Sequence, residues 1–329
     1  MHTQQSDLQV QPLVTFIVTY YNLPVDMLRK CLESITALSL SRSEHQIIVI
    51  DDGSDESPLS QLGQFVDDII YIRQHNGGLS TARNRALMMA EGQYIQFVDA
   101  DDYLLQTPYE HCLDLARYQR SDVVMFDMTS DEEQVAVADF NTADLESGTE
   151  YLAHNNLHAT ACGYLFRRNI LGTLRFTPGI YHEDEEFTPQ LLLRAETVSS
   201  TDAQAYYYRQ RPHSITNEKD KKRILKRLED CHQVIVKLNR IADTMPTDER
   251  NALGRRVAQL TMDYIYNIIT QTRSRHLLDR KLEELRREGL FPLPDREYTT
   301  KYKWFRRLTN SSIGLSLLMN MLPMINNEK

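Results

Sequence analysis

Tyr94-Ile-Gln-Phe-Val-Asp-Ala-Asp-Asp102 is a nearly apolar run that ends in three carboxylates. Its first five residues are typical of a strand that is buried in a sheet. Acidic side chains directly after such a strand lie at the carboxyl edge of a parallel sheet, where these sheets bind ligands. An isolated acidic turn is more often a solvated turn or a helix cap, so the rest of the chain has to decide the role of residues 99–102.

Similar runs precede and follow this segment. Apolar and β-branched residues predict strands at residues 13–19, 46–50, 69–72 and 123–126, in addition to 94–98. Apolar residues at helical spacing predict helices after the first strand and over residues 79–90. This alternation predicts an α/β fold with a Rossmann-like, mostly parallel sheet flanked by helices.

The chain changes character twice after this alternation. Residues 129–149 are acidic and loop-like, and we expect them to separate a first half (about 12–128) from a second half (about 149–216). From residue 217 the chain is charged and helical, with one apolar face that includes Ile224, Leu228 and Val234. We therefore expect one domain over residues 1–216 and a helical C-terminal region over 217–329.

Composition excludes several classes of protein. The 329 residues are 41% hydrophobic, enough for one large core and a smaller appendage. A net charge of -9 argues against nucleic acid as a partner. The four cysteines form no Cys-x-x-Cys pair, which argues against zinc and disulfide frameworks and favours a reducing compartment. Residues 1–11 lack the pattern of a signal peptide, and no apolar run approaches the roughly 20 residues of a membrane span.

The acidic cluster at residues 99–102 suits a hard metal ion. A divalent cation that neutralises the phosphates of a nucleotide is held by one or two carboxylates. Asp99 and Asp101 fall on one side of an extended strand end, so Asp99 can face a ribose while Asp101 faces the cation. Asp102 is left for a structural role.

Six motifs stand in a fixed order along the first 215 residues or so. They are Phe16-Ile-Val-Thr-Tyr-Tyr-Asn22, Val49-Ile-Asp-Asp-Gly-Ser54, Asn76-Gly-Gly-Leu-Ser-Thr-Ala-Arg-Asn84, Phe97-Val-Asp-Ala-Asp-Asp102, His182-Glu-Asp-Glu-Glu186 and Tyr207-Tyr-Arg-Gln-Arg-Pro-His-Ser214. In these motifs the sequence resembles the family 2 glycosyltransferases, which have the GT-A fold. The resemblance implies a GT-A domain over residues 1–216, with a nucleotide-binding half at about 12–128 and an acceptor half at about 149–216.

For the donor nucleotide, the resemblance implies a pocket at the ends of the first strands. Its expected residues are Thr19, Tyr21, Asn22, Asp52, Asn76, Gly77, Arg83, Asp99 and Ala100. Asp52 would accept a hydrogen bond from the base, most often uracil, although capping the next helix is equally open to it. Gly77 permits close approach of the backbone to a ligand. Arg83 can reach base or phosphate, and its alternative is a surface salt bridge.

For catalysis, the resemblance implies Asp184 as the general base and Glu183 as a residue that orients the acceptor. The alternative for residues 183–186 is an acidic first turn that complements the dipole of a helix starting near Phe187. Arg211 and Ser214 would close over the diphosphate, because arginine donates two hydrogen bonds to a phosphate at once. His213 would join Asp101 and Asp99 at the metal, or would be an ordinary surface histidine.

The resemblance therefore implies an inverting hexosyl- or hexosaminyltransferase. It would move one sugar from a UDP-sugar to a saccharide or lipid-linked saccharide, with Mn²⁺ or Mg²⁺, in synthesis of a surface polysaccharide. The sequence lacks the Gln-x-x-Arg-Trp motif of processive synthases. A non-catalytic nucleotide-sugar-binding relative remains an alternative. A sugar-nucleotide pyrophosphorylase is disfavoured, because Thr19-Tyr-Tyr-Asn-Leu-Pro24 contains no glycine-rich loop.

The C-terminal region has its own motif. Lys301-Tyr-Lys-Trp-Phe-Arg-Arg307 is basic and aromatic and precedes an apolar stretch at residues 313–325. This pattern is typical of docking at an anionic membrane surface, and a helix packed on the core is equally open. We expect a cytoplasmic protein that is either free or peripheral on the inner face of the membrane. The helical region is also a candidate for forming a homo-oligomer.

Overall fold

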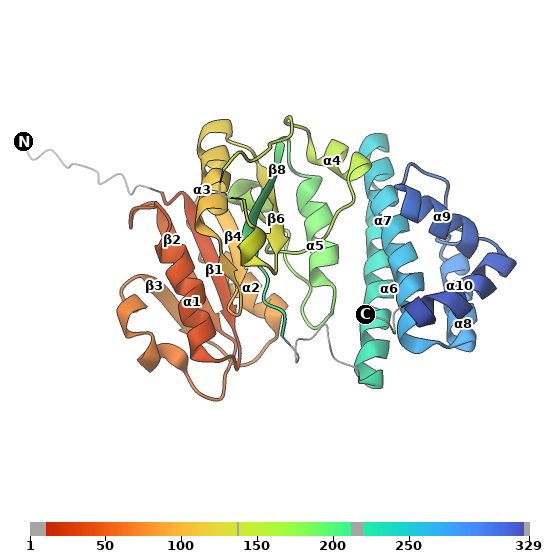
Figure 1. Cartoon of the computed structure of the whole chain (residues 1–329), viewed down its shortest axis with the longest axis horizontal. Helices are drawn as coiled ribbons and strands as arrows, with labels where there is room; N and C mark the ends of the chain where they lie inside the picture. The colour runs from red at the N-terminus through yellow and green to blue at the C-terminus, as the bar shows by residue number, and fades with distance from the viewer. Residues whose placement is uncertain (1–10, 137, 212–219, 326–329) are drawn as a thin grey trace, which may run out of the picture. The chain divides into compact units, whose positions relative to one another are not determined.

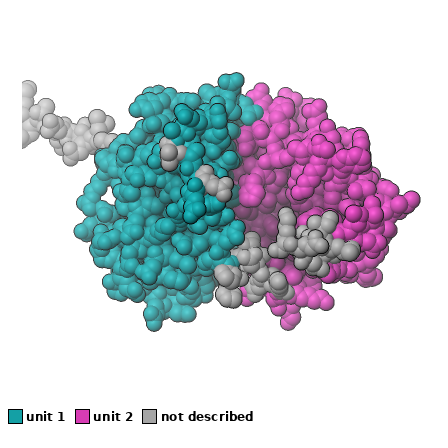
Figure 2. Space-filling model, in the orientation of Figure 1, with its two compact units in different colours: residues 1–148, 159–179, 194–211 teal, residues 149–158, 180–193, 212–329 magenta. Residues whose placement is uncertain are grey.

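The computed structural model describes residues 11–136, 138–211 and 220–325. The chain divides into two compact units, which Figure 2 distinguishes by colour. Unit 1 comprises residues 1–148, 159–179 and 194–211, and unit 2 comprises residues 149–158, 180–193 and 212–329. The units do not follow the boundary expected at residue 216, because two segments of the expected acceptor half belong to the helical unit.

Unit 1 is built on an eight-stranded sheet with the order β3-β2-β1-β4-β7-β6-β8-β5 (Figure 1). Its strands are β1 Val14–Tyr20, β2 His45–Asp51, β3 Ile69–Arg73, β4 Tyr94–Asp99, β5 Tyr103–Leu104, β6 Val123–Thr129, β7 Tyr164–Arg167 and β8 Val198–Tyr207. The five predicted strands are all present, each within three residues of its expected ends.

The sheet is mixed. Strands β1 to β4 pair in parallel, as the alternation of strands and helices predicts, and β6 pairs in parallel with β8. Strand β7 runs antiparallel to both β4 and β6, and β5 runs antiparallel to β8. Because β7 is antiparallel to both neighbours, β6 and β8 run in the same direction as β1 to β4, and only β7 and β5 are reversed. The sheet is therefore mostly parallel, as expected, with two reversed strands.

Helices connect the strands of unit 1 and make up most of unit 2 (Figure 1). In unit 1 they are α1 Val25–Thr36, α2 Leu79–Leu87 and α3 Gln106–Asp114, which continues as a π-helical segment at Leu115–Gln119. In unit 2 they are α4 Gly148–His154, α5 Glu183–Leu192, α6 Lys221–Asp243, α7 Thr247–Asn267, α8 Arg275–Arg287, α9 Thr300–Thr309 and α10 Ser312–Ile325. The first residue of α4, Gly148, is the last residue of a unit 1 segment. Short 3-10 turns occur at Pro58–Gln61, Gly63–Phe65, Glu132–Gln134 and Arg168–Leu171.

Strand register brings the polar strand ends of unit 1 to one edge. Thr19 on β1 pairs with Asp99 on β4, and Tyr20 pairs with Asp51 on β2. The residues before these ends are buried on both faces of the sheet, so the strands cannot slide without exposing apolar side chains. The register therefore fixes which polar residues meet at the carboxyl edge.

Unit 2 has a helical core of its own. Helix α6 begins at a side-chain cap, because Asp220 accepts hydrogen bonds from the backbone of Lys222 and Arg223. Its predicted apolar face packs against α7 and α8, with Val234 and Leu282 both buried in one cluster. Among the described residues, none of the helices combines the length and the apolar character that a bilayer crossing requires.

Candidate active site

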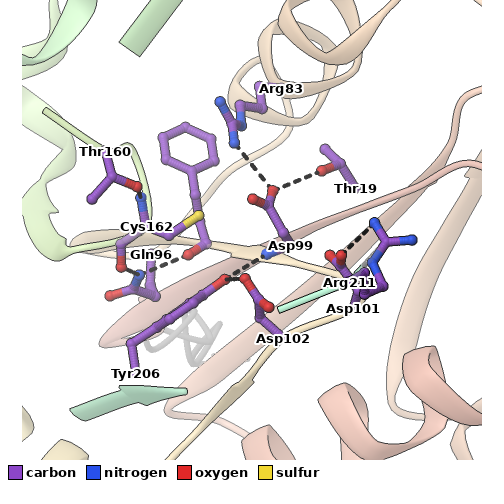
Figure 3. A network of polar contacts seen from close by, with 11 residues as sticks. Thr19, Arg83, Gln96, Asp99, Asp101, Asp102, Thr160, Cys162, Tyr206 and Arg211 are labelled. Atoms are coloured by element: carbon purple, nitrogen blue, oxygen red, sulfur yellow. Dashed lines mark hydrogen bonds and ion pairs between the residues drawn. The ribbon is translucent and has the colours of Figure 1, made fainter. Parts of the chain in front are cut away.

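Asp99 ends β4 and receives two side chains from other elements of unit 1. Arg83 Nη2 lies 3.1 Å from Asp99 Oδ1, and Thr19 Oγ1 donates to the same oxygen over 3.4 Å. Figure 3 shows Arg83 and Thr19 converging on this carboxylate. The Asp99 side chain is 35% exposed, so one side of it faces solvent. The structure thus places three predicted residues together at one strand end.

Arg83 is buried rather than on the surface. Only 3% of the residue is exposed, and its guanidinium lies 5.6 and 5.3 Å from the ring centroids of Phe97 and Phe176. These aromatic faces favour a cation. The alternative of a surface salt bridge is therefore wrong: Arg83 does form an ion pair, with Asp99, but its guanidinium is enclosed by the protein and does not lie on the surface.

Asp101 faces a second arginine. Arg211 Nη2 lies 2.5 Å from Asp101 Oδ2, and the two side chains are 28% and 17% exposed (Figure 3). Burial and then the charge of Asp99 raise the pKa of Asp101, while Arg211 lowers it. The two neighbouring carboxylates therefore create an excess of negative charge, and Arg211 offsets part of it.

Asp102 is a structural residue by its contacts. It is 2% exposed and accepts hydrogen bonds from the Tyr206 hydroxyl and the Arg209 backbone N–H, both at 2.8 Å. The Tyr206 hydroxyl in turn accepts a 3.1 Å bond from the Asp99 backbone N–H. Burial, followed by the charge of Asp99, raises the pKa of Asp102 to about 8. These bonds tie the segment after β8, which carries Arg211, to the acidic turn.

Asp52 holds a glycine-containing loop. Its carboxylate accepts hydrogen bonds from the backbone of Gly77 (2.9 Å) and Gly78 (2.8 Å) and from the Gln74 amide (2.7 Å). The loop leads into α2, whose N-cap is Gly78 at φ +82°. Asp52 therefore holds the loop that precedes α2 and does not cap the first turn of the helix itself, and its bond to a base stays a prediction. Asn76 and Gly77 lie exposed on this loop.

The loop after β1 is fixed by reciprocal bonds. Asn22 sits at φ +47°, and its Oδ1 accepts a 2.9 Å bond from the Asp55 backbone N–H. Its own backbone N–H donates to Ser54 Oγ over 3.0 Å. Tyr21 beside it is 48% exposed. The structure therefore presents both predicted pocket residues at the carboxyl edge of β1, with Tyr21 open to solvent.

The predicted base lies in unit 2, at the start of α5. This helix begins at Glu183, four residues before the expected start, because His182 at φ +64° forms its N-cap. Asp184 Oδ1 accepts a 2.8 Å bond from the Glu185 backbone N–H. Both Glu183 and Asp184 are half-buried. The acidic first turn considered for residues 183–186 is therefore present, and it does not exclude a catalytic role.

The neighbouring acids of α5 are ion-paired within unit 2. Glu185 pairs with the buried Arg256 of α7, and Glu186 pairs with Lys237 of α6 over 2.5 Å. These ion pairs attach the first turn of α5 to the helical core. His213 and Ser214, predicted for the metal and the diphosphate, lie outside the described residues.

Comparison with protein families and curated proteins identifies the domain. Residues 15–174 match the model of Glycosyl transferase family 2. This segment is a family 2 glycosyltransferase domain. The chain is 31% identical to the uncharacterized glycosyltransferase EpsJ of Bacillus subtilis, over 62% of this chain and 63% of that protein. It is 30% identical to the glycosyltransferase GlyA of Streptococcus pneumoniae, over 63% of this chain and 32% of GlyA. The chain thus spans less than two thirds of each relative.

Solved structures show the same fold over nearly the whole chain. The fragment TarS 1–349 of S. aureus, solved in complex with UDP-GlcNAc, has a TM-score of 0.66 and 17% identity, and the match covers 96% of this chain and 91% of that fragment. The mannosyltransferase PcManGT of Pyrobaculum calidifontis, solved with GDP-Man and Mn²⁺, has a TM-score of 0.57 and 14% identity, covering 97% and 87%. The GT-A fold expected from the motifs is confirmed.

Two structural residues of the family 2 domain and its flank were missed from sequence. Asp51, fully buried, accepts bonds from the Ser54 backbone N–H (2.8 Å) and the Tyr71 hydroxyl (2.7 Å). Tyr206, in the apolar run just before the Tyr207-Tyr-Arg motif, links Asp99 to Asp102. The doubled Asp51-Asp52 could have indicated the role of Asp51. In such a pair one carboxylate can accept hydrogen bonds at the strand end while the other accepts them from the next loop. Nothing in the local sequence distinguished Tyr206 from an ordinary core tyrosine.

Proposed function

We propose that this chain is an inverting glycosyltransferase. It transfers one hexosyl or hexosaminyl unit from a UDP-sugar to a saccharide, free or lipid-linked, in synthesis of a surface polysaccharide. The observation that carries the proposal is the pair Asp99 and Asp101, each beside an arginine, at the carboxyl edge of parallel strands in a family 2 domain. The solved complex of TarS with UDP-GlcNAc supports a UDP-sugar as donor.

The proposed nucleotide pocket uses the loops at this edge. Tyr21 and Asn22 would contact the base, and Asp52 would accept its imide N–H. A carboxylate has about four acceptor positions, and three bonds to the loop leave one for the base. Thr19, Asn76, Gly77 and Ala100 would line the donor, and Arg83 would keep Asp99 oriented toward the ribose.

The acidic pair also fits a divalent cation. Mg²⁺ and Mn²⁺ in nucleotide sites take one or two carboxylates and complete their shell with phosphate oxygens and water. The described residues include no group of three or more His, Cys, Asp or Glu side chains that could hold a metal alone. We propose that Asp101 and Asp99 hold Mn²⁺ or Mg²⁺ together with the diphosphate, with His213 as a further candidate ligand. Such an ion would neutralise the departing diphosphate.

Two residues of α5 would act on the acceptor. Asp184 would remove the proton from the acceptor hydroxyl as its oxygen bonds to the anomeric carbon and the bond from that carbon to the diphosphate breaks. This single displacement inverts the anomeric centre. Glu183 would orient the acceptor sugar. Arg211 would turn from Asp101 to the diphosphate when the donor binds, with Ser214 beside it.

The base assignment is tested with Asp184→Asn. We expect the change to lower the turnover number by about 10²- to 10⁴-fold, since it removes a general base, and to leave the Kd for UDP nearly unchanged. Asp243→Asn, an exposed acid at the end of α6, is the matched control and should keep full turnover. Turnover is measured with a radiolabelled donor sugar and UDP binding by calorimetry. Normal turnover of the Asp184 variant would show that Asp184 is not the general base.

Donor hydrolysis by the purified chain separates the leading proposal from a non-catalytic relative. UDP-, GDP- and dTDP-sugars are compared with and without manganese. We expect manganese-dependent release of UDP from one UDP-sugar. Binding of a nucleotide sugar without release or transfer would instead support a binding protein of the same fold.

If the acceptor is lipid-linked, the protein works at a membrane. We propose a cytoplasmic protein that associates peripherally with the inner face of the membrane, where such acceptors are elongated.

A further inference from the structure

The C-terminal helices α9 and α10 differ in charge from the rest of the chain. The whole chain has a net charge of -9, whereas residues 300–325 contain four basic residues and no acidic ones. Arg306 is paired with Asp295 over 2.7 Å. Lys301, Lys303 and Arg307 form no ion pair with any other residue that the structure describes. Three cations are therefore available on α9.

These cations share the outer face of α9 with an exposed tryptophan. Lys301, Lys303 and Arg307 are exposed, and Trp304 between them is 59% exposed. The Arg307 guanidinium lies 5.6 Å from the centre of the Trp304 ring. The opposite side of α9 packs inward, where Phe305 contacts the helical core. An exposed aromatic ring among lysines and arginines is the residue composition of a membrane interface.

Helix α10 has apolar residues on both sides, and its outer side also carries the exposed Ser312, Ser316 and Asn320. Leu315 and Leu318 are buried in the core of unit 2. On the outer side, Ile313, Leu317 and Met321 are 83%, 47% and 50% exposed and recur every four residues. A helix that only packs on a core does not usually expose a row of three large apolar side chains as well. The row formed by Ile313, Leu317 and Met321 is therefore suited to contact with a second apolar environment outside the core.

The turn between the two helices fixes both outer faces in one arrangement. Asn310 donates to the Leu293 carbonyl over 2.8 Å and accepts from the Leu293 N–H over 2.9 Å. Gly314 allows a close approach, because a Cβ there would lie 2.4 Å from the Leu308 carbonyl oxygen. Figure 1 shows α9 and α10 next to each other at the blue end of the chain. The basic and apolar rows thus lie on two adjacent helices that are joined by a hydrogen-bonded, closely packed turn.

We propose that the outer faces of α9 and α10 form a docking surface for the interface of an anionic lipid bilayer. The apolar row of α10 would enter the headgroup boundary while Lys301, Lys303 and Arg307 contact anionic headgroups. With 14 residues, α10 is about 21 Å long, too short to cross the hydrocarbon core, so it lies in the interface. A second copy docked face to face is disfavoured, because three cations would oppose three cations.

The single tryptophan of the chain reports on this surface directly. Full-length protein is mixed with phosphatidylcholine vesicles, with and without phosphatidylglycerol. We expect cosedimentation and a blue shift of Trp304 emission with the anionic vesicles only, both weakened by salt. Equal binding to zwitterionic vesicles, or binding without an emission shift, would overturn the proposal.

Two sets of exposed substitutions test the two rows. Leu317→Glu with Met321→Glu should abolish vesicle binding, and Lys301→Gln, Lys303→Gln and Arg307→Gln together should weaken it about 100-fold. Their matched controls are Met88→Glu with Tyr118→Glu, exposed apolar residues of unit 1, and Lys221→Gln, Lys222→Gln and Arg223→Gln at the start of α6. Equal loss in variants and controls would contradict the docking surface.

Two further measurements complete the test. Sedimentation velocity without lipid should show no change of mass between wild type and the α10 variant. If the wild type does not bind vesicles and forms a dimer that the α10 variant does not form, this surface would instead be the interface with a second copy. Donor hydrolysis without vesicles should be the same in all variants. Loss of hydrolysis with intact vesicle binding would count against the proposed function and not against the docking surface.

Discussion

Arg83 shows how a single charged residue is accommodated inside unit 1. Its side chain is 4% exposed and approaches two aromatic rings, and its Nη2 pairs with Asp99. Removal of one partner from an enclosed ion pair leaves the other charge poorly solvated, whereas removal of both partners together avoids this cost. The orientation of Asp99 therefore depends on a residue that does not need to touch a ligand.

A double-mutant cycle measures this coupling. We expect Arg83→Met to lower the free energy of unfolding by about 2 kcal/mol, and Asp99→Asn in the same chain to restore about 1 kcal/mol. The coupling stays small because Asp99 is 35% exposed. Arg85→Met on the exposed side of α2 is the control and should change stability by less than about 0.5 kcal/mol. Urea denaturation gives all of these values, and strictly additive effects would show that the pair is not coupled.

Ion pairs and hydrogen bonds join three helices of unit 2. Arg256 of α7 pairs with Glu185 of α5, and two turns further along α7 Asp263 accepts bonds from the Tyr302 hydroxyl of α9 at 2.9 and 3.0 Å. These contacts connect α5, which carries Asp184, through α7 to α9, which carries Trp304. Each link is a specific polar contact between side chains of different helices.

Asp263 makes part of this connection sensitive to pH. Burial raises its pKa to about 6, while the nearby Arg256 lowers it. Because the folded chain binds this proton more tightly than the unfolded chain, its contribution to stability is full below about pH 4 and is lost as the pH rises through about 6.

We therefore expect the stability of the wild type relative to Asp263→Asn to fall by about 1 to 3 kcal/mol between pH 4 and pH 7. Thermal unfolding across this range measures the difference. The exposed Asp243→Asn should run parallel to the wild type. A difference between the wild type and the Asp263 variant that is independent of pH would contradict the raised pKa.

In the molecule as a whole, neither compact unit is one continuous segment of the sequence. Unit 2 takes residues 149–158 and 180–193 from the middle of the chain and combines them with the C-terminal helices. Ile180 and Leu193, at the two ends of the α5 segment, pack against the helical core. The helix with the proposed base therefore depends on residues that follow it in the sequence, since Lys237 and Arg256 lie 51 and 71 positions after their partners Glu186 and Glu185.

This dependence predicts the behaviour of a chain that ends at residue 216. We expect α5 to lose protection from amide hydrogen exchange in that fragment, because Arg256, Lys237 and the apolar cluster are missing. Amides of β1 to β4 should stay protected, which serves as the internal control. Equal protection of α5 in the fragment and the full chain would show that α5 folds independently of the helical region.

The strands and the motif residues were readable from sequence because they depend on local patterns. A buried strand needs a short apolar run, and β2 and β4 each have one that stops at a carboxylate. Parallel pairing then brings these carboxylates to one edge whatever the details of packing. The expected grouping of Thr19, Arg83 and Asp99 follows from this rule and from the family motifs.

Contacts between distant segments could be read only from the tertiary structure. The antiparallel entry of β7, the link from Tyr206 to Asp102, the loop held by Asp52 and the place of α5 in the helical unit all join residues separated by 22 to 104 positions. A local pattern shows that a side chain will be buried or polar, and it contains no information on which distant partner satisfies it. The sequence by itself thus determined the strands, their acidic ends and the family, whereas folding decided which charges and hydroxyls meet there, because those partners are chosen by packing.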